Sequence, residues 1–471
     1  MKSFILRMII IHSVNAKPRL ACSEAAPRLH GSPDGTLHWD LARLDGASDD
    51  GRSAVMDAPV NGPANEALWA RTDAVIPGGG IYLTRSARFA GRDVMPSFIA
   101  SAEGCRLVDA DGRSFLDFNC GNGPNLLGYR HPEVDAAAAS QAARVDLAAF
   151  FPEVMPAYAE RLLEWGDGFH WALFTKNGSD STNLAMRIMR AARRQPYVVL
   201  FESAYHGFGI EIALAPETTF DEQHKYVIRV PWNDAGALLE VADTYGEQVA
   251  GIMLNPLDQN PAQPTRGVSP ELVDAIARFR ERTGALVTVD DVRNGFRLHP
   301  RGSHVHMGID PDLLCLGKAQ ANGYSTSTVL GREALRAAAE RINFTATYMF
   351  SAVAFRAGMA TIDIYERDGV FDHIVAMGQR LKDGIVRAGR EAGHEDTVMS
   401  GPAAMPTFLF AEDSKAKRAR TFARHAAQRG AIFHPLLNWF VSFAHKEADI
   451  DEAIDIARQA FELTPTDVSL L

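Results

Sequence analysis

Cysteine is scarce in this 471-residue sequence. Its four cysteines are Cys22, Cys105, Cys120 and Cys315, and no two of them are spaced as Cys-x-x-Cys. The usual spacings of structural zinc sites are therefore excluded, and there is no disulfide framework of the kind that small secreted domains use. We expect a reducing, cytoplasmic setting and no metal in the functional site.

Long apolar runs and clusters of positive charge are also missing. No segment approaches the ~20 consecutive apolar residues that a membrane-spanning helix needs. The formal net charge of -10 argues against nucleic acids or anionic membranes as partners, and no basic stripe is interleaved with aromatic residues. Since 46% of the residues are hydrophobic, the chain can bury a sizeable core and is expected to be globular.

The first 65 residues lack apolar periodicity. Residues 17–65 are rich in Gly, Ala, Pro, Ser and Asp, a composition typical of disorder. The opening MKSFILRMIIIHSVNA superficially resembles a secretory signal, but its apolar segment is short and is interrupted by Arg7. We expect residues 1–65 to be a disordered leader, with Met56 as an alternative start.

Short strands that are apolar throughout alternate with helices in the middle of the chain. Examples are YVVLFES (197–203), VAGIMLNP (249–256), GALVTVD (284–290) and DLLCLG (312–317). Such strands are typical of a largely parallel, doubly wound α/β sheet with both faces covered. The flanking segments, in which Asp111-Gly112 predicts a hairpin turn, indicate a smaller α+β domain. The predicted division is a leader (1–65), the N-terminal part of the small domain with a link (66–154), a large ligand-binding domain (155–344) and the C-terminal part of the small domain (345–471).

Polar residues follow several of these strands, and ligands of open parallel sheets bind beyond the carboxyl ends of the strands. In NGSDST (177–182), Gly178 and Ser179 open a helix whose free amides and dipole favour an anion. Ser and Asp are equally ordinary helix caps. Tyr205 and His206 follow the next strand, where an aromatic ring either stacks on a flat ligand or only packs.

Asp290 ends an apolar strand, so its carboxylate needs a cationic or hydrogen-bonded partner. It is either a functional group or a structural one that caps a helix or pairs with Arg293 or Arg297. Both interpretations stay open at this point.

Lysine is rare in the chain, with nine lysines beside thirty-nine arginines, and only Lys176 and Lys318 follow strands of the predicted sheet. A partly desolvated lysine has a lowered pKa and attacks carbonyl groups to form a Schiff base. The alternative is a lysine at a strand end whose ammonium group reaches solvent.

These strand-end groups together are those that pyridoxal 5'-phosphate (PLP) requires. The N-terminus of a helix can bind the phosphate, and an aromatic side chain can stack on the face of the pyridine ring. A buried carboxylate can hold a proton on the pyridine nitrogen, and a lysine can bind the aldehyde. The combination is far more specific than any one member. The sequence therefore predicts PLP as the cofactor.

Between about Val75 and Phe461 the chain carries, in this order, the segments DADGRSFLDF, LLGYRHPEV, NGSDST, VDDVRNGFR, PDLLCLGKAQANGY and FVSFAHKEADIDEA. Through them it resembles the class III aminotransferases, and within these the group around glutamate-1-semialdehyde 2,1-aminomutase. The resemblance implies the fold-type I PLP fold, in which a large, doubly wound and mostly parallel sheet domain is joined to a smaller α+β domain. It also implies a homodimer with shared active sites, and small-molecule amino donors and carbonyl acceptors as partners.

The resemblance assigns roles to individual residues. Lys318 matches the Schiff-base lysine and Asp290 the carboxylate under the pyridine nitrogen, and these two are the predicted catalytic residues. Thr347 matches a threonine that reaches the phosphate from the partner subunit. The predicted cofactor-binding set is Gly178, Ser179, Tyr205, His206, Asp290, Val292, Lys318 and Thr347.

Positions that contact substrate in the aminomutase are altered. The usual NSPVR is IYLTR, Leu437 replaces a glutamate before FVS, and Asn255 replaces the glutamate of a Glu-Pro pair. The PLP-binding residues are intact while the pocket differs, so we expect an aminotransferase with a non-standard acceptor. Three histidines in HPRGSHVH (299–306) are expected at the surface or the pocket rim. The candidate substrate residues are Tyr82, Arg85, Asn122, His434, Asn438 and Trp439.

The predicted reaction moves an amino group from a donor to an aldehyde or ketone through a Lys318 Schiff base and pyridoxamine phosphate. The same residues could instead run an intramolecular amino shift of the aminomutase type, an epimerisation or a decarboxylation. A catalytically inactive binding subunit is a further alternative, and the intact Lys318 and Asp290 argue against it.

Overall fold

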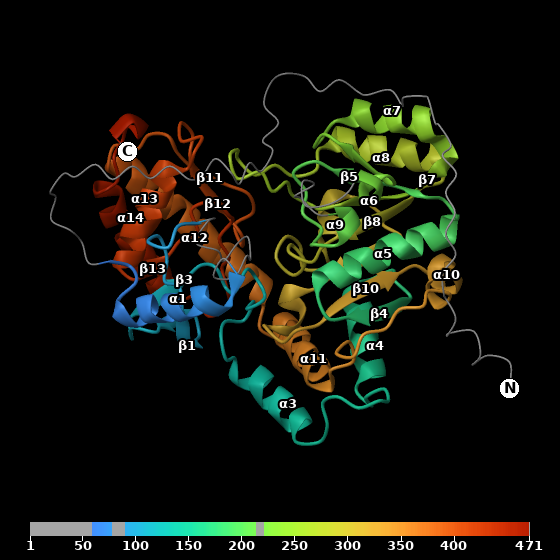
Figure 1. Ribbon diagram of the computed structural model, residues 1–471, viewed down its shortest axis with the longest axis horizontal. Coiled ribbons are helices and arrows are strands. Elements are labelled where there is room, and N and C mark those ends of the chain that lie inside the picture. Colours follow the sequence, from blue (N-terminus) through green and yellow to red (C-terminus); the bar gives the residue numbers. More distant parts are fainter. Residues whose placement is uncertain (1–58, 78–89, 213–220, 471) are drawn as a thin grey trace, which may run out of the picture. The chain divides into compact units, whose positions relative to one another are not determined.

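The computed structural model describes residues 59–77, 90–212 and 221–470 (Figure 1). Tyr82 and Arg85 of the predicted substrate set and most of the predicted leader lie outside the described residues. The first described helix, α1 (Pro63–Val75), overlaps the last residues of that leader, because the amide of Asn65 bonds Asp111 at 2.6 Å and anchors the segment.

A seven-stranded sheet in the order β4-β10-β9-β8-β7-β5-β6 forms the centre of the larger domain. Its strands are β4 (Trp171–Thr175), β5 (Tyr197–Phe201), β6 (Val227–Val230), β7 (Val249–Leu254), β8 (Leu286–Asp290), β9 (Leu313–Leu316) and β10 (Ser327–Gly331). Neighbouring strands from β9 to β6 pair in parallel, and β10 pairs antiparallel with both β9 and β4. The predicted, mostly parallel α/β sheet is confirmed.

Helices cover both faces of this sheet. They are α4 (Met155–Trp165), α5 (Gly178–Arg193), α6 (Asp221–His224), α7 (Ala235–Tyr245), α8 (Pro270–Thr283), α9 (Ser303–Met307) and α10 (Arg336–Glu340). Alternate residues of a strand face opposite sides. Accordingly, Cys315 of β9 clusters with Leu184 of α5, whereas Leu316 belongs to the cluster that contains Phe279 of α8. Helices α7 and α8 lie side by side (Figure 1).

Segments from both ends of the chain build the smaller domain. Its four-stranded sheet has the order β1-β2-β3-β13, and β13 pairs in parallel with β3. The predicted hairpin at Asp111-Gly112 joins β2 and β3, with Gly112 at φ +81°. The other described elements outside the large sheet are β1 (Ile99–Glu103), β2 (Arg106–Asp109), β3 (Ser114–Asp117), β11 (Thr397–Ser400), β12 (Thr407–Phe410), β13 (Ala431–Ile432), α3 (Pro132–Ala142), α11 (Ala352–Arg367), α12 (Val370–Glu391), α13 (Lys417–Gln428) and α14 (Glu447–Glu462).

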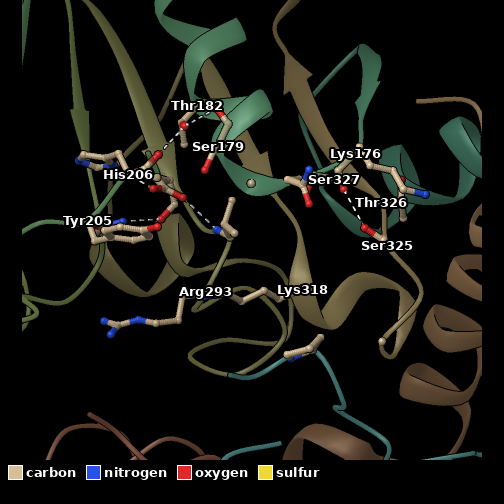
Figure 2. Close-up of a pocket in the computed structure, with 18 of the residues that line it drawn as sticks. Lys176, Ser179, Thr182, Tyr205, His206, Arg293, Lys318, Ser325, Thr326 and Ser327 are labelled. Atoms are coloured by element: carbon tan, nitrogen blue, oxygen red, sulfur yellow. Dashed lines mark hydrogen bonds and ion pairs between the residues drawn. The ribbon is translucent and has the colours of Figure 1, made fainter. Parts of the chain in front are cut away.

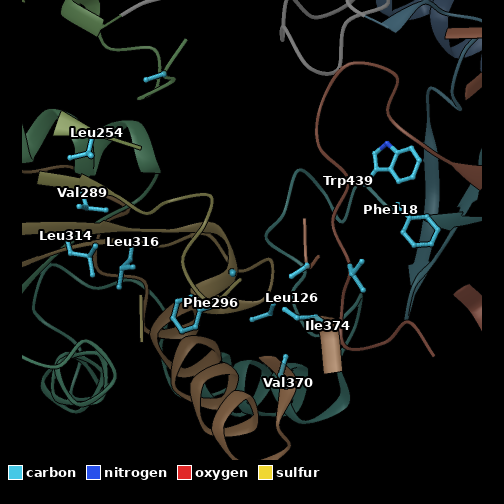
Figure 3. Close-up of a cluster of buried hydrophobic side chains, with 14 of the residues drawn as sticks. Phe118, Leu126, Leu254, Val289, Phe296, Leu314, Leu316, Val370, Ile374 and Trp439 are labelled. Atoms are coloured by element: carbon cyan, nitrogen blue, oxygen red, sulfur yellow. The ribbon is translucent and has the colours of Figure 1, made fainter. Parts of the chain in front are cut away.

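One large apolar cluster runs from the carboxyl ends of the central strands into the smaller domain (Figure 3). Leu254 and Leu316 come from strand ends, and Phe118 and Trp439 come from the smaller domain. No helix in the described part of the chain combines the length and the apolar composition that crossing a bilayer requires.

One expectation about the histidines of residues 299–306 is wrong. His304 is buried rather than at the surface, and its ring packs edge-on against Phe169 at 5.7 Å. A Cβ on Gly302 would contact both the His304 ring and Trp165, and Trp165 stacks on Phe296 with ring centroids 4.2 Å apart. This pair supports the turn that follows β8.

Replacing Trp165 by alanine is expected to lower the free energy of unfolding by about 3–5 kcal/mol, because the fully buried ring leaves a cavity. Its indole N–H has no hydrogen-bond partner among the described residues, so the loss reports packing alone. Thermal unfolding followed by circular dichroism measures the effect. The Trp165→Phe variant should lose less, and an alanine variant as stable as the parent would contradict the prediction.

Candidate active site

A cavity of about 390 Å³ lies at the carboxyl ends of the strands of the large sheet (Figure 2). Asp290 ends β8, His206 follows β5 and Lys318 follows β9, while Ser179 lies in the first turn of α5 directly after β4. All four line the cavity. The structure thus brings together groups from four separate stretches of sequence, as the strand-end argument predicts.

Lys318 adopts an uncommon backbone conformation. Its φ is +43°, in the left-handed region that residues with a side chain seldom adopt. The preceding Gly317 is required, since a Cβ there would lie 2.6 Å from the hydroxyl of Ser327. Burial and the nearby positive charge of Arg293 lower the pKa of Lys318 to about 8, with Asp290 opposing the shift.

The carboxylate of Asp290 is almost fully buried, with 3% of the residue exposed. Its Oδ2 lies 2.8 Å from Nδ1 of His206, and its Oδ1 accepts the backbone N–H of Val292 at 3.2 Å. It therefore pairs with the histidine and not with Arg293 or Arg297. The other ring nitrogen of His206, Nε2, is buried without a partner among the described residues.

Two further contacts hold this pair in place. The hydroxyl of Thr182 donates to the carbonyl oxygen of His206 at 2.6 Å. The side chain of Asn255 accepts the N–H of Tyr205 at 3.1 Å and donates to the carbonyl oxygen of Asp290 at 3.3 Å. Asn255, noted in the sequence only as a departure from the aminomutase, thus ties the ends of β5 and β8 together.

The first turn of α5 faces the cavity, and the residue that caps this helix precedes the turn. Asn177 is the N-cap residue and its backbone N–H donates to the carboxylate of Asp180 at 2.8 Å, so Ser179, already inside the helix, is not the cap. Gly178 and Ser179 line the cavity. A Cβ on Gly178 would lie 2.5 Å from Val292, so glycine allows the helix terminus to approach the turn after β8 closely. The unbonded amides of a first helical turn suit an anion.

The remaining predicted cofactor residues are placed differently. Tyr205 and Val292 line the cavity, and 42% of Tyr205 is exposed. Thr347 is exposed and does not line the cavity within this chain. Lys176 and Thr326, which the sequence argument did not select, also line it. The hydroxyl of Thr326 is buried without a partner among the described residues.

The predicted substrate residues divide into two groups. Asn438 lies in a small hollow beside the cavity and accepts a hydrogen bond from Arg293 at 3.1 Å. His434 and Trp439 are buried away from the cavity, where the indole N–H of Trp439 donates to the carbonyl oxygen of His434. Asn122, at φ +69° in a turn, does not line the cavity either.

Arg293 is the main site residue that the sequence argument did not identify. It lines both the cavity and the adjoining hollow, yet the sequence suggested it only as a structural partner of Asp290. The usable signal was its place three residues beyond Asp290, the last residue of β8, and next to Val292. Arg297 has a structural position instead, since it donates to the carbonyl oxygens of Val441 and Gly123 at 2.6 and 3.1 Å.

This chain belongs to the class III aminotransferases, whose family model matches residues 89–461. It is 33% identical over 412 residues to an aminopentol aminotransferase of Sphingopyxis macrogoltabida, covering 88% of this chain and 97% of that one. It is 28% identical to a glutamate-1-semialdehyde 2,1-aminomutase of Syntrophobacter fumaroxidans, covering 82% and 94%. The solved structure of the FumI protein of Sphingopyxis sp. MTA144 with PLP superposes with a TM-score of 0.83 at 32% identity, over 85% of this chain and 96% of that one.

The chain is therefore a PLP-dependent aminotransferase, and the predicted family, fold type and cofactor are confirmed. The residues of the cavity fit PLP. An orphaned hydroxyl on Thr326 and the first turn of α5 offer donors to a phosphate, a buried carboxylate faces the same space, and a lysine of lowered pKa completes the set.

The lowered pKa of Lys318 can be measured on the PLP-free protein. Only the neutral amine reacts with acetic anhydride, so the labelling rate should rise with pH and reach half its maximum near pH 8. Competitive acetylation followed by mass spectrometry gives the value. A midpoint near the ordinary lysine value of 10.5 would show that the amine is neither desolvated nor close to another cation.

Proposed function

We propose that Lys318 is the residue that binds PLP covalently and carries the proton during transamination. The observation that supports this is the position of its amine, which shares one cavity with the Asp290–His206 pair and the first turn of α5. A pKa near 8 leaves a substantial neutral fraction at physiological pH. The neutral amine can attack a carbonyl carbon and accept a proton from the donor carbon.

The other residues bind and orient. PLP supplies an electron sink for negative charge on the substrate carbon. Asp290, oriented by its contact with His206, would hold a proton on the pyridine nitrogen. Val292 and Tyr205 would contact the two ring faces, and the amides of Gly178 and Ser179 would bind the phosphate. The burial of Asp290 strengthens its electrostatic effect by excluding water.

The amine substrate that we propose carries hydroxyl groups along its carbon chain. One relative acts, by its name, on an aminopentol, an amine with five hydroxyl groups. Polar side chains able to bond a hydroxyl group line the small hollow beside the cavity, together with Leu436 and Leu437; with a volume of about 20 Å³ the hollow has room for one such group, and the rest of the chain would lie in the main cavity. The polar lining residues are Asp258, Gln259, Asn260, Thr265, Arg293, Thr407 and Asn438.

The absorbance spectrum of the PLP-loaded protein tests the function and the role of Lys318 together. An amine that the enzyme uses as amino donor should reduce the visible absorption band of the bound PLP and be released as the corresponding carbonyl compound. The Lys318→Ala variant should retain PLP through its phosphate but lose turnover by at least roughly 1,000-fold. Lys318→Arg, which keeps the charge without the nucleophile, should lose as much, and the surface variant Lys225→Ala should behave as the parent.

Ordinary turnover in Lys318→Ala would refute the assignment. A visible band that no donor converts would instead favour the intramolecular amino shift, the reaction for which another relative is named. That shift is read directly by supplying glutamate-1-semialdehyde and following 5-aminolevulinate formation.

We also propose that the chain forms a homodimer with shared active sites, in which Thr347 of one subunit reaches the phosphate in the other. Large apolar side chains are exposed close to the site: Phe208 is 76% exposed while its N–H donates to the hydroxyl of Ser179, and Tyr348 is 60% exposed beside Thr347. Phe150 is 84% exposed as well. Such exposure is typical of an interface.

Light scattering tests the dimer. The parent should have twice the mass of the 51.4-kDa chain, and the double variant Phe150→Asp/Tyr348→Asp should shift toward a single chain. Val305→Asp, at another exposed apolar position, is the matched control. A monomeric parent would contradict the proposal.

A further inference from the structure

The side chain of Asn322 joins the turn after β9 to a distant loop of the smaller domain, the loop between β3 and α3. Its Oδ1 accepts the backbone N–H of Leu127 at 2.8 Å, and its Nδ2 donates to the carbonyl oxygen of Gly128 at 3.0 Å. Only 6% of Asn322 is exposed. Because one planar amide makes both bonds, it fixes the orientation of the turn relative to the loop as well as their separation.

That loop is itself held in place by the smaller domain. The N–H of Phe443 donates to the carbonyl oxygen of Leu126 at 2.8 Å, and Tyr129 exchanges two backbone hydrogen bonds with Gly104, at 2.7 and 3.0 Å. The side chains of Leu126 and Leu127 are buried in the large apolar cluster. The loop is therefore a fixed point to which the neighbouring turn is attached.

The turn that Asn322 anchors carries Lys318. It consists of η6 (Lys318–Ala321), a single turn of 3-10 helix, and Asn322 follows it at φ +43°. Lys318 has the same φ of +43°, and a residue with a side chain keeps such a conformation only where the surrounding structure enforces it. At the start of the turn, Gly317 lies close to Ser327. Asn322 supplies the corresponding constraint at the end.

Gln320 shows that this anchoring belongs to Asn322. Gln320 lies in the same turn and is fully buried, yet neither polar atom of its amide has a hydrogen-bond partner among the described residues. Helix α11 packs on the turn, but apolar packing is non-directional and does not by itself select one backbone conformation. The two hydrogen bonds of Asn322 have the direction that packing lacks.

The side chain of Asn322 acts on the turn and not on a ligand. It does not line the cavity, whereas the next two residues, Gly323 and Tyr324, do. A glycine would adopt the same left-handed backbone without strain, so the backbone alone does not require asparagine. What asparagine adds at this position is the pair of hydrogen bonds to the loop.

We propose that Asn322 is a positioning residue, which fixes the backbone of the Lys318 turn against the loop between β3 and α3 and so determines the direction in which the amine enters the cavity. The inference rests on the proposed role of Lys318 as the residue that binds PLP covalently. Attack on a carbonyl carbon requires the nitrogen at a suitable distance and angle, and loss of that alignment lowers the rate even where the cofactor still binds.

Two glycine variants separate this role from a general effect on the fold. Asn322→Gly removes both hydrogen bonds and keeps the left-handed backbone. Asn233→Gly is the matched control, because Asn233 has φ +60° and also bonds two backbone groups, the carbonyl oxygen of Gly267 and the N–H of Ser269, both at 2.9 Å. Asn233 does not line the cavity.

The rate of Schiff-base formation is the first readout. When PLP is added to the PLP-free protein, the visible band should appear roughly 10- to 100-fold more slowly in Asn322→Gly than in the parent, because the amine is no longer aligned. It should appear at the parental rate in Asn233→Gly. Pyridoxamine phosphate, which forms no Schiff base, should bind both variants as tightly as it binds the parent.

Titration of Lys318 gives a second readout, which needs no cofactor. If the turn relaxes, the amine gains access to water. The midpoint of its acetylation should then rise from about pH 8 toward the ordinary lysine value of 10.5 in Asn322→Gly, but not in Asn233→Gly.

A parental rate together with an unchanged midpoint in Asn322→Gly would overturn the proposal. Equal slowing in both glycine variants would also overturn it, because it would show a general loss of stability. If the parent forms no visible band with PLP, the proposed function of Lys318 fails, while the acetylation midpoints still decide whether Asn322 positions the amine.

Discussion

The burial of a single carboxylate constrains the rest of the site. Asp290 ends a strand whose residues are buried, and a buried carboxylate is costly unless a hydrogen-bonding partner is brought to it. That partner, His206, comes from a loop more than eighty residues earlier, and its carbonyl oxygen is held in turn by Thr182 of α5. One charge thus links β5, β8 and α5.

The strand-end chemistry could be read from the sequence because a parallel sheet gathers the carboxyl ends of its strands at one edge. Apolar runs locate the strands, so the polar residue after each run is placed without knowledge of the helices between them. Asp290, His206, Ser179 and Lys318 meet in one cavity for this reason. The parallel pairing and the two covered faces follow from the same apolar runs.

Residues of the smaller domain were less predictable. His434 and Trp439 belong to a loop without periodicity, and whether their side chains face the cavity or the core depends on packing against Phe433 and Phe408, which no local pattern encodes. The state of Arg293 depends on competition: Asp258 is taken by Arg266 and Asp290 by His206. Such choices among partners far apart in the chain follow only from three-dimensional structure.

Arg297 has a consequence for how such an enzyme can change over evolution. Its guanidinium joins the turn after β8 to two loops of the smaller domain through carbonyl oxygens, at Gly123 and Val441. Every residue type carries that oxygen, so the joint itself does not restrict the residue at position 441; the full burial of Val441 in the core does. The alignment of the smaller domain with the sheet can therefore survive the replacement of residue 441 by another apolar side chain that fits the core.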